Sequence, residues 1–337
     1  FVSDEMWKYF HAQHGHMSQE QLRRHWQASK CDLLEVYCSE QSQLTYQSSK
    51  LGLKSFRFGL KQGDLSTFLG RTRLYDMLWT FRPKHIWVSP RCAPWSQWNH
   101  LNASKSLKLE EQILADKKSE KIHLLVCDAL FRLQMWRGLQ FHFHLEQPQG
   151  SDMIHQHEMQ NIVGHTIRIL CDMCVAGGLK HPNSHEALRK RTQVLTTSAI
   201  LGRMLEKCQC VGNHHHDVIA RSCKPWGHAR QSLSKFTELY TAMFGQRLGK
   251  AIQCSIQVHE KCPEHEPCFV QRTISSREPP PTEIAQDEPK RRRLFGKFHP
   301  DQIFAPSEPS ETTSSPEVPA ERSQTPPSSE DLSSSRS

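Results

Sequence analysis

Polar groups able to do chemistry follow short apolar segments at several points of this chain. They are a polar run at 38–43, Gly63-Asp64, Pro90-Arg91-Cys92, Glu146-Gln147-Pro148 and Arg189-Lys190-Arg191. A cysteine thiolate is a strong nucleophile, and nearby cations favour the thiolate over the thiol. A carboxyl group can exchange a proton with a reacting ligand. If the fold brings these segments together, they predict nucleophilic chemistry at one site.

Short β-rich runs alternate with longer helical stretches in the part of the chain that carries these groups. The β-rich runs predict strands at 33–37, 56–58, 85–88, 141–145, 167–171 and 193–196, and the helical stretches include 44–51, 74–81 and 107–136. This alternation is typical of an α/β fold and predicts a Rossmann-like, doubly wound and mostly parallel sheet. Ligands of such sheets bind beyond the carboxyl ends of the strands, so we expect the polar groups to meet at that edge.

The motifs and their order resemble those of the DNA cytosine-5 methyltransferases. The counterparts are the first strand at 33–38, Gly63-Asp64, Pro90-Arg91-Cys92 with Ser96, Glu146-Gln147-Pro148 and Arg189-Lys190-Arg191. The stretch 31–252 is also similar to a divergent methyltransferase-like module of dinoflagellate retroelement-type polyproteins, through the sequences at 63–67, 145–148 and 235–240. The resemblance implies a methyltransferase fold with S-adenosylmethionine as cofactor and DNA as substrate.

The resemblance also implies a role for each site residue. Cys92 would add to C6 of a flipped cytosine. C5 of cytosine is a weak nucleophile until a thiolate has added at C6. Glu146 would hydrogen-bond the base, while Arg189 and Arg191 would stabilise the adduct or lower the pKa of the thiol. The cofactor-binding residues would be Glu35, Ser39, Glu40, Asp64 and Pro90. Among these, Asp64 would accept a hydrogen bond from the adenine amine.

Departures from the family pattern keep other functions open. The run 38–42 contains no glycine, the strand at 56–58 ends without an acidic residue, and Arg91 separates Pro90 from Cys92. The chain could therefore be a non-catalytic nucleic-acid-binding or zinc-containing interaction module of a mobile-element protein. It could also be an RNA or protein methyltransferase that does not use Cys92. In the plainest interpretation, Cys92 fills apolar space and Glu146 caps a turn.

Cysteine and histidine residues form candidate zinc ligands. Tetrahedral zinc takes nitrogen and sulfur ligands, and the predicted ligands are Cys171, Cys174, Cys208, Cys210, His214 and His216. A second group at Cys254, Cys262, His265 and Cys268 could form a small zinc knuckle. The alternative is a set of buried thiols and surface imidazoles. The chain contains 12 Cys and no visible secretory signal, which favours reduced thiols over disulfides.

Changes in composition divide the chain into segments. We expect a helical leader at 1–30, a methyltransferase-like domain at 31–253, a Cys/His-containing segment at 254–275 and a disordered tail at 276–337. The tail is rich in Pro, Ser and Glu and poor in apolar residues, so it cannot bury enough apolar surface to fold. Its basic run at 290–293 could be a nuclear import signal, a phosphate-binding patch or a solvated charge cluster.

Composition narrows the classes of partner and location. The formal net charge is +8, which is compatible with a nucleic-acid partner, and the resemblance makes DNA the expected one. No run of apolar residues is long enough to span a membrane. We therefore expect a nuclear protein that is neither secreted nor membrane-bound. Nothing in the sequence indicates an oligomeric state.

Overall fold

A six-stranded sheet forms the centre of the fold in the computed structural model. Its strands are β1 (Leu33–Val36), β2 (Ser55–Phe58), β3 (His85–Val88), β4 (His142–Pro148), β5 (Ile167–Asp172) and β7 (Arg191–Thr196), in the order β2-β1-β3-β4-β7-β5. The ladders between β2, β1, β3 and β4 are parallel. These strands lie where the sequence predicts them, and the α/β class is confirmed.

The sheet is mixed, because β7 runs antiparallel to both of its neighbours, β4 and β5. The other five strands run in one direction, in keeping with the prediction of a mostly parallel sheet. A parallel connection usually crosses the sheet through an α-helix. Residues 173–190, between β5 and β7, contain only the four-residue helix α8 (Met173–Ala176) and the short strand β6 (Ala187–Leu188). No helix there crosses the sheet, and β7 returns in the opposite direction.

Helices surround the sheet. They are α1 (Val2–His14), α2 (Gln19–Gln27), α3 (Gln43–Lys50), α4 (Phe68–Phe81), α6 (Leu107–Arg137), α7 (Gln160–Gly164), α9 (Ala199–Glu206), α10 (Leu233–Phe236) and α11 (Ala242–Lys261). Short strands pair outside the main sheet: β6 with β8 (His216–Asp217), and β9 (Ser222–Cys223) with β10 (Gln231–Ser232). Among the described helices, none is long and apolar enough to cross a membrane.

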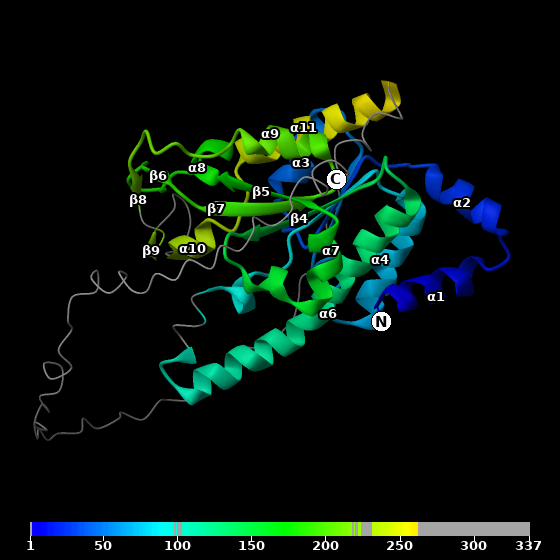
Figure 1. Cartoon of the computed structure of the whole chain (residues 1–337), viewed down its shortest axis with the longest axis horizontal. Helices are drawn as coiled ribbons and strands as arrows, with labels where there is room; N and C mark the ends of the chain where they lie inside the picture. The colour runs from blue at the N-terminus through cyan, green and yellow to red at the C-terminus, as the bar shows by residue number, and fades with distance from the viewer. Residues whose placement is uncertain are drawn as a thin grey trace, which may run out of the picture. The chain divides into compact units, whose positions relative to one another are not determined.

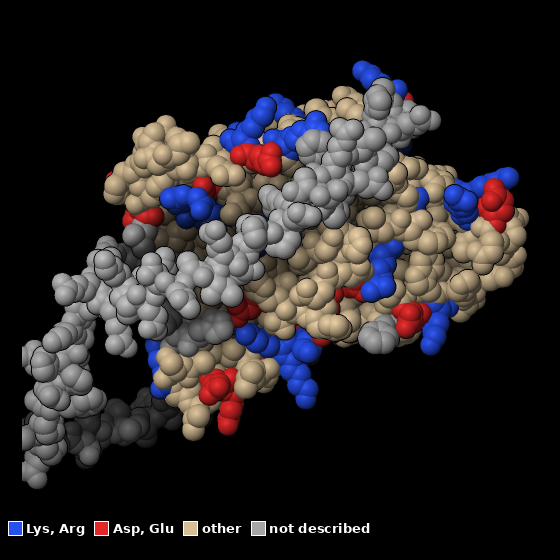
Figure 2. All heavy atoms as spheres, viewed as in Figure 1, with Lys and Arg blue, Asp and Glu red and all other residues tan. Residues whose placement is uncertain are grey.

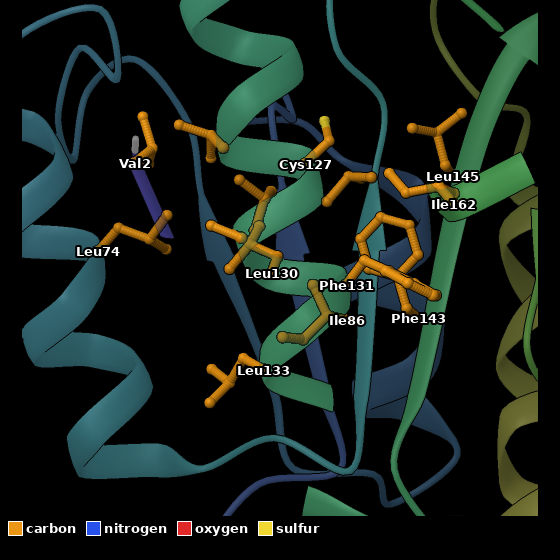
Figure 3. Close-up of a cluster of buried hydrophobic side chains, with 14 of the residues drawn as sticks. Val2, Leu74, Ile86, Cys127, Leu130, Phe131, Leu133, Phe143, Leu145 and Ile162 are labelled. Atoms are coloured by element: carbon orange, nitrogen blue, oxygen red, sulfur yellow. The ribbon is translucent and has the colours of Figure 1, made fainter. Parts of the chain in front are cut away.

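The helices form one layer on each face of the sheet. Helices α3, α9 and α11 cover one face, and α4, α6 and α7 cover the other (Figure 1). Neighbouring strand residues point to opposite faces, so Leu33 packs in one hydrophobic cluster and Leu34 in the other. Figure 3 shows the second cluster, in which Leu130 and Phe131 of α6 lie among side chains of the sheet such as Phe143.

The residues described are 2–97, 99, 103–217, 219, 222–223 and 231–261. The chain divides into two units, Phe1–Glu278 and Pro279–Ser337, and every described residue belongs to the first. The predicted tail at 276–337, its basic run and most of the second Cys/His group (Cys262, His265 and Cys268) therefore lie outside the described residues.

The leader helices pack onto the rest of the first unit. Val2, Met6 and Phe10 recur at helical spacing and are buried, so α1 presents one apolar face to α4 and α6. An ion pair joins Arg71 of α4 to Glu5 of α1, with Nε and Oε1 2.8 Å apart. A capping box at Ser18 begins α2.

Two buried histidines join the central strands. His85 Nδ1 of β3 lies 3.0 Å from His144 Nε2 of β4, and His144 Nδ1 lies 2.7 Å from Thr196 Oγ1 of β7. Burial lowers the pKa of both histidines well below its ordinary value. The folded state therefore excludes protons that the unfolded chain takes up below a pH of about 6.5.

We expect the free energy of unfolding to fall as the pH drops below about 6.5, by up to about 1.4 kcal/mol per pH unit for each of these histidines. Replacing both, with His85→Leu and His144→Leu, should reduce that slope; the part due to His25, whose pKa burial lowers to about 4, should remain. The matched control is His155→Gln with His157→Gln, because both side chains are exposed. Glu35 and Glu146, whose pKa values burial raises, act in the opposite sense but are common to all variants. Urea unfolding at several pH values measures the slope, and equal slopes in the two double variants would contradict this account.

Candidate functional site

A cavity of about 740 Å³ lies at the carboxyl edge of the parallel strands. Its walls are the segments that follow β1, β2, β3 and β4, together with Lys190 and residues of 235–240. Strand β1 lies between β2 and β3, so the chain leaves β1 toward one side and returns beside it on the other. Ligands of open α/β sheets bind at such a switch point. Of the residues predicted for the site, the cavity brings together Glu35, Ser39, Asp64, Pro90, Cys92 and Glu146.

The turn after β1 is sharp although it contains no glycine. Tyr37 adopts φ +64°, the left-handed conformation that glycine usually supplies. Its backbone N–H donates to Phe58 O at 2.9 Å, and its hydroxyl lies 3.2 Å from His123 Nδ1. A non-glycine residue held in this region carries strain, which is common where a protein binds a ligand. Tyr37 therefore gives the chain a sharp turn directly after β1.

Glu35 connects the cavity to the start of α3. Its Oε2 accepts hydrogen bonds from the Ser42 hydroxyl, from Thr45 Oγ1 at 2.6 Å and from Thr45 N at 3.1 Å. Ser42 is the N-cap of α3, so the carboxylate lies at the end of the helix where negative charge is stabilised. Burial raises the pKa of Glu35, and the hydrogen bonds oppose that rise.

Asp64 is an exposed carboxylate at the cavity wall. Its Oδ1 accepts a hydrogen bond from Ser66 N at 2.9 Å, and this bond lowers the pKa of Asp64. The backbone of Asp64 packs directly against Gly70, where a Cβ atom would lie only 1.9 Å from Asp64 O. Glu40, also predicted to bind cofactor, lies outside the cavity lining and pairs with Lys61 at 3.2 Å.

Cys92 lies at the start of the short 3-10 helix η1 (Ala93–Trp95) and lines the cavity. Burial raises the pKa of the thiol, Lys190 lowers it, and Glu146 raises it further. The preceding Pro90 accepts a hydrogen bond from Gln147 Nε2 at 2.8 Å, which fixes the segments after β3 and β4 relative to each other. Arg91, which interrupts the Pro-Cys pair, extends to Glu120 of α6 at 3.2 Å.

Glu146 belongs to a buried hydrogen-bond network that the sequence does not predict. The Tyr240 hydroxyl donates to Glu146 Oε2 at 3.1 Å and lies 2.6 Å from Ser89 Oγ. Trp87 Nε1 donates to both hydroxyls, at 3.0 and 3.1 Å. Burial raises the pKa of Glu146, and Lys190 opposes the rise. The segment 235–240 carries part of the family resemblance, and that was the available signal for Tyr240.

The basic triplet Arg189-Lys190-Arg191 is divided between Asp172 and the cavity. Arg189 Nε and Arg191 Nε both donate to Asp172 Oδ1, at 3.2 and 2.9 Å, and neither arginine lines the cavity. Lys190, between them, does line it. The cation facing Cys92 and Glu146 is therefore Lys190, which the sequence interpretation passed over in favour of its two neighbours.

A group of cysteine and histidine side chains lies beside Asp172 and could hold a metal ion. It consists of Cys174, Cys210, His214 and His216, whose ligand atoms all lie within 4.8 Å of one another. We refer to these four residues as the metal group. Of the six predicted ligands, Cys171 and Cys208 are not in it. Both are buried in the core, and Cys208 Sγ accepts a hydrogen bond from Arg247 Nη1 at 2.8 Å.

Figure 2 shows Lys and Arg side chains interspersed with Asp and Glu on the part of this face that the grey atoms leave visible. The cavity and the metal group are the features that bear on function. Comparison with known proteins adds no further guide, because no family model, no curated protein and no solved structure matches the chain.

Proposed function

We propose that this chain is an S-adenosylmethionine-dependent methyltransferase-like protein that modifies C5 of cytosine in DNA through Cys92. The observation that carries the proposal is the meeting of Cys92, Glu146 and Asp64 in one cavity at the switch point of the sheet. These residues come from segments far apart in the sequence. Their order and chemistry are those that the family resemblance implies.

The cavity fits a nucleoside-type ligand in several respects. Its volume of about 740 Å³ falls in the ordinary range of ligand pockets, about 300–1,000 Å³. The turn at Tyr37 lets the backbone after β1 approach a ligand, Asp64 offers an ionised acceptor for an adenine amine, and Pro90 gives an apolar wall. When bound, S-adenosylmethionine would supply an electrophilic methyl group.

Residues on the other side of the cavity suit the cytosine. The Cys92 thiolate would form a bond to C6, moving electron density to C5 and N3. Burial favours the protonated form of Glu146, which can donate a hydrogen bond to N3 as that charge develops. Lys190 adds a cation beside both groups. Once C5 carries the methyl group, its proton would pass to water. The electron pair of that C–H bond would restore the C5–C6 double bond as the bond from C6 to sulfur breaks and the Cys92 thiolate leaves.

We also propose Zn²⁺ as the ion of the metal group. Two thiols and two imidazoles form the donor set that tetrahedral zinc prefers, and four protein ligands close the site to substrate. The role of the ion would therefore be structural.

A second candidate is a non-catalytic nucleic-acid-binding module held together by the same zinc. It is favoured by the end of β2, where Phe58-Gly59 offers no carboxylate to a ribose, and by the pairing of Glu40 with Lys61. An RNA or protein methyltransferase on the same fold would retain the cofactor and not need Cys92. The proposed DNA substrate, together with the basic run at 290–293, leads us to propose a nuclear location.

Calorimetric titration of S-adenosylmethionine into the full chain tests the cofactor site. We expect saturable binding that Asp64→Ala weakens by about 10- to 100-fold, because a hydrogen bond to a charged group contributes about 1.5–3 kcal/mol. The matched control is Asp116→Ala on α6, which lies outside the cavity lining and should bind as the wild type does. Folded wild-type protein that binds no cofactor at millimolar concentration would favour the non-catalytic module.

A further inference from the structure

The metal group has the spacing of a formed zinc site. Cys210 Sγ lies 3.8 Å from His214 Nε2 and 3.5 Å from His216 Nε2, and Cys174 Sγ lies 3.4 Å from His216 Nε2. Zinc with bonds of about 2.3 Å to sulfur and about 2.0–2.1 Å to nitrogen would hold tetrahedral ligands about 3.6 Å apart. These three distances are close to that value, and all four ligand atoms lie within 4.8 Å of one another, so one ion could bind all four side chains.

Neighbouring groups orient these ligands. His214 Nδ1 lies 3.0 Å from Asn213 Oδ1, the kind of outer contact that directs the other ring nitrogen toward a metal. Asp172 Oδ2 accepts a hydrogen bond from Cys210 N at 2.8 Å. The same carboxylate is the acceptor for Arg189 and Arg191.

The metal group is tied at three points to residues 187–191, which we call the linking segment. Ala187 pairs with the ligand His216 in the β6–β8 ladder. Met173 N, next to the ligand Cys174, donates to Lys190 O at 2.9 Å. The third tie is Asp172, which contacts Cys210 and both arginines of the segment.

Side chains of the linking segment divide between the metal group and the cavity. Arg189 and Arg191 both donate to Asp172. Lys190 N donates to Leu188 O at 3.1 Å, which closes a tight turn around Arg189, and the Lys190 side chain lines the cavity and donates from Nζ to Thr237 O at 2.8 Å. The linking segment therefore connects the metal group to the part of the cavity that holds Cys92 and Glu146.

We propose that zinc bound by Cys174, Cys210, His214 and His216 fixes the linking segment and thereby positions Lys190 beside Cys92 and Glu146. Lys190 is the positioned cation, and the metal acts through it without contacting substrate. The inference rests on the proposed function only in taking Cys92 as the reactive thiol. Both of its measurements are independent of methyl transfer.

The first measurement is the zinc content of the full chain by native mass spectrometry. Cys210→Ser and His216→Ala should each lose one equivalent relative to wild type. The matched control is His215→Ala: His215 lies between two ligands but contacts Glu186 at 2.8 Å, and it should retain the ion. Equal loss in His215→Ala, or no zinc in the wild type, would overturn the site.

The second measurement is the alkylation rate of Cys92 at fixed pH, followed peptide by peptide. The charged groups that act on Cys92 are Lys190, Glu146 and Glu238. Lys190→Met should slow alkylation by about tenfold if loss of the cation raises the thiol pKa by about one unit. Removing zinc with a chelator should slow the wild type in the same way and have little further effect on Lys190→Met. Cys38, which lines the same cavity, is the internal reference.

A second variant covers the case in which the metal-free protein unfolds. Unfolding would expose the buried Cys127 and accelerate its alkylation, which the same peptide analysis detects. Asp172→Asn then replaces chelation, because it retains the four ligands while weakening the tie to Arg189 and Arg191. It should keep zinc and slow Cys92. A Cys92 rate equal to that of the wild type in zinc-containing Asp172→Asn would overturn the positioning role, whether or not the protein transfers methyl groups.

Discussion

Arg137→Met is expected to lower the free energy of unfolding by about 3–5 kcal/mol, the cost of breaking a buried charged network from one side. Arg137 is the last residue of α6 and is 1% exposed. Its guanidinium donates to Trp26 O, Arg82 O and Pro83 O, and to Gln134 Oε1. It also lies over the Phe141 ring, 3.7 Å from the ring centroid.

The expected loss of unfolding free energy is large because the ends of three helices meet around the Arg137 side chain. Helices α2 and α4 end next to the carbonyls that Arg137 binds, and α6 ends at Arg137 itself. Carbonyls at helix C-termini lack partners within the helix and carry partial negative charge. Methionine would fill much of the space but remove the Arg137 donor from Trp26 O. Arg82 O and Pro83 O would keep only their bonds from Ser29 Oγ and Gln134 Nε2. A buried polar group that loses its partner costs about 1–3 kcal/mol.

Urea unfolding of Arg137→Met and Arg132→Met measures the difference. Arg132 lies on the same helix, 55% exposed, and pairs with Asp128 at 2.7 Å. Because Arg132 is exposed and Asp128 also accepts a hydrogen bond from Asn161, Arg132→Met should remain within about 0.5 kcal/mol of wild type. Arg137→Lys retains the charge without the planar fork and should fall between the two. If Arg137→Met unfolds at the same urea concentration as Arg132→Met, the network does not stabilise the fold.

Cys92→Ala is expected to abolish covalent trapping by DNA containing 5-fluorocytosine and to reduce methyl transfer by at least about 10³-fold, since the thiolate forms the bond that activates the base. Glu146→Gln should reduce turnover by about 10²–10³-fold, because the amide donates more weakly to the charge that develops on the ring. Both variants should retain cofactor binding, since Asp64 and Tyr37 follow β2 and β1, whereas Cys92 and Glu146 belong to β3 and β4 and the segments after them.

Cys38→Ala is the matched control, because Cys38 lines the same cavity and burial raises the pKa of its thiol to about 12. It should trap DNA and transfer methyl groups as the wild type does. If Cys92→Ala still forms the covalent complex with DNA, another thiol is the nucleophile. If Cys92→Ala leaves methyl transfer unchanged, the chain would instead be an RNA or protein methyltransferase that does not use Cys92. DNA binding without cofactor binding in the wild type would support the non-catalytic module.

The strands and their order along the chain could be predicted because each is a short apolar run between helical or polar segments. Strand β3 was predicted at its observed bounds, and β1 and β2 within one residue at each end. The site residues Asp64, Cys92 and Glu146 could be predicted as well, because the carboxyl ends of parallel strands lie at one edge of the sheet. The direction of β7 could not be predicted, because direction depends on how the chain returns after β5.

The sequence by itself determined the α/β class, the edge of the sheet that carries the cavity and the residue types gathered there. Only the tertiary structure decided which members of each motif are used. Lys190 faces the cavity instead of its arginine neighbours, and Cys174 and Cys210 join the metal group while Cys171 and Cys208 enter the core. Tyr37 adopts a left-handed backbone conformation that its residue type does not predict. Composition and spacing are local properties, whereas the side to which a side chain points is set by strand register and by contacts between distant segments.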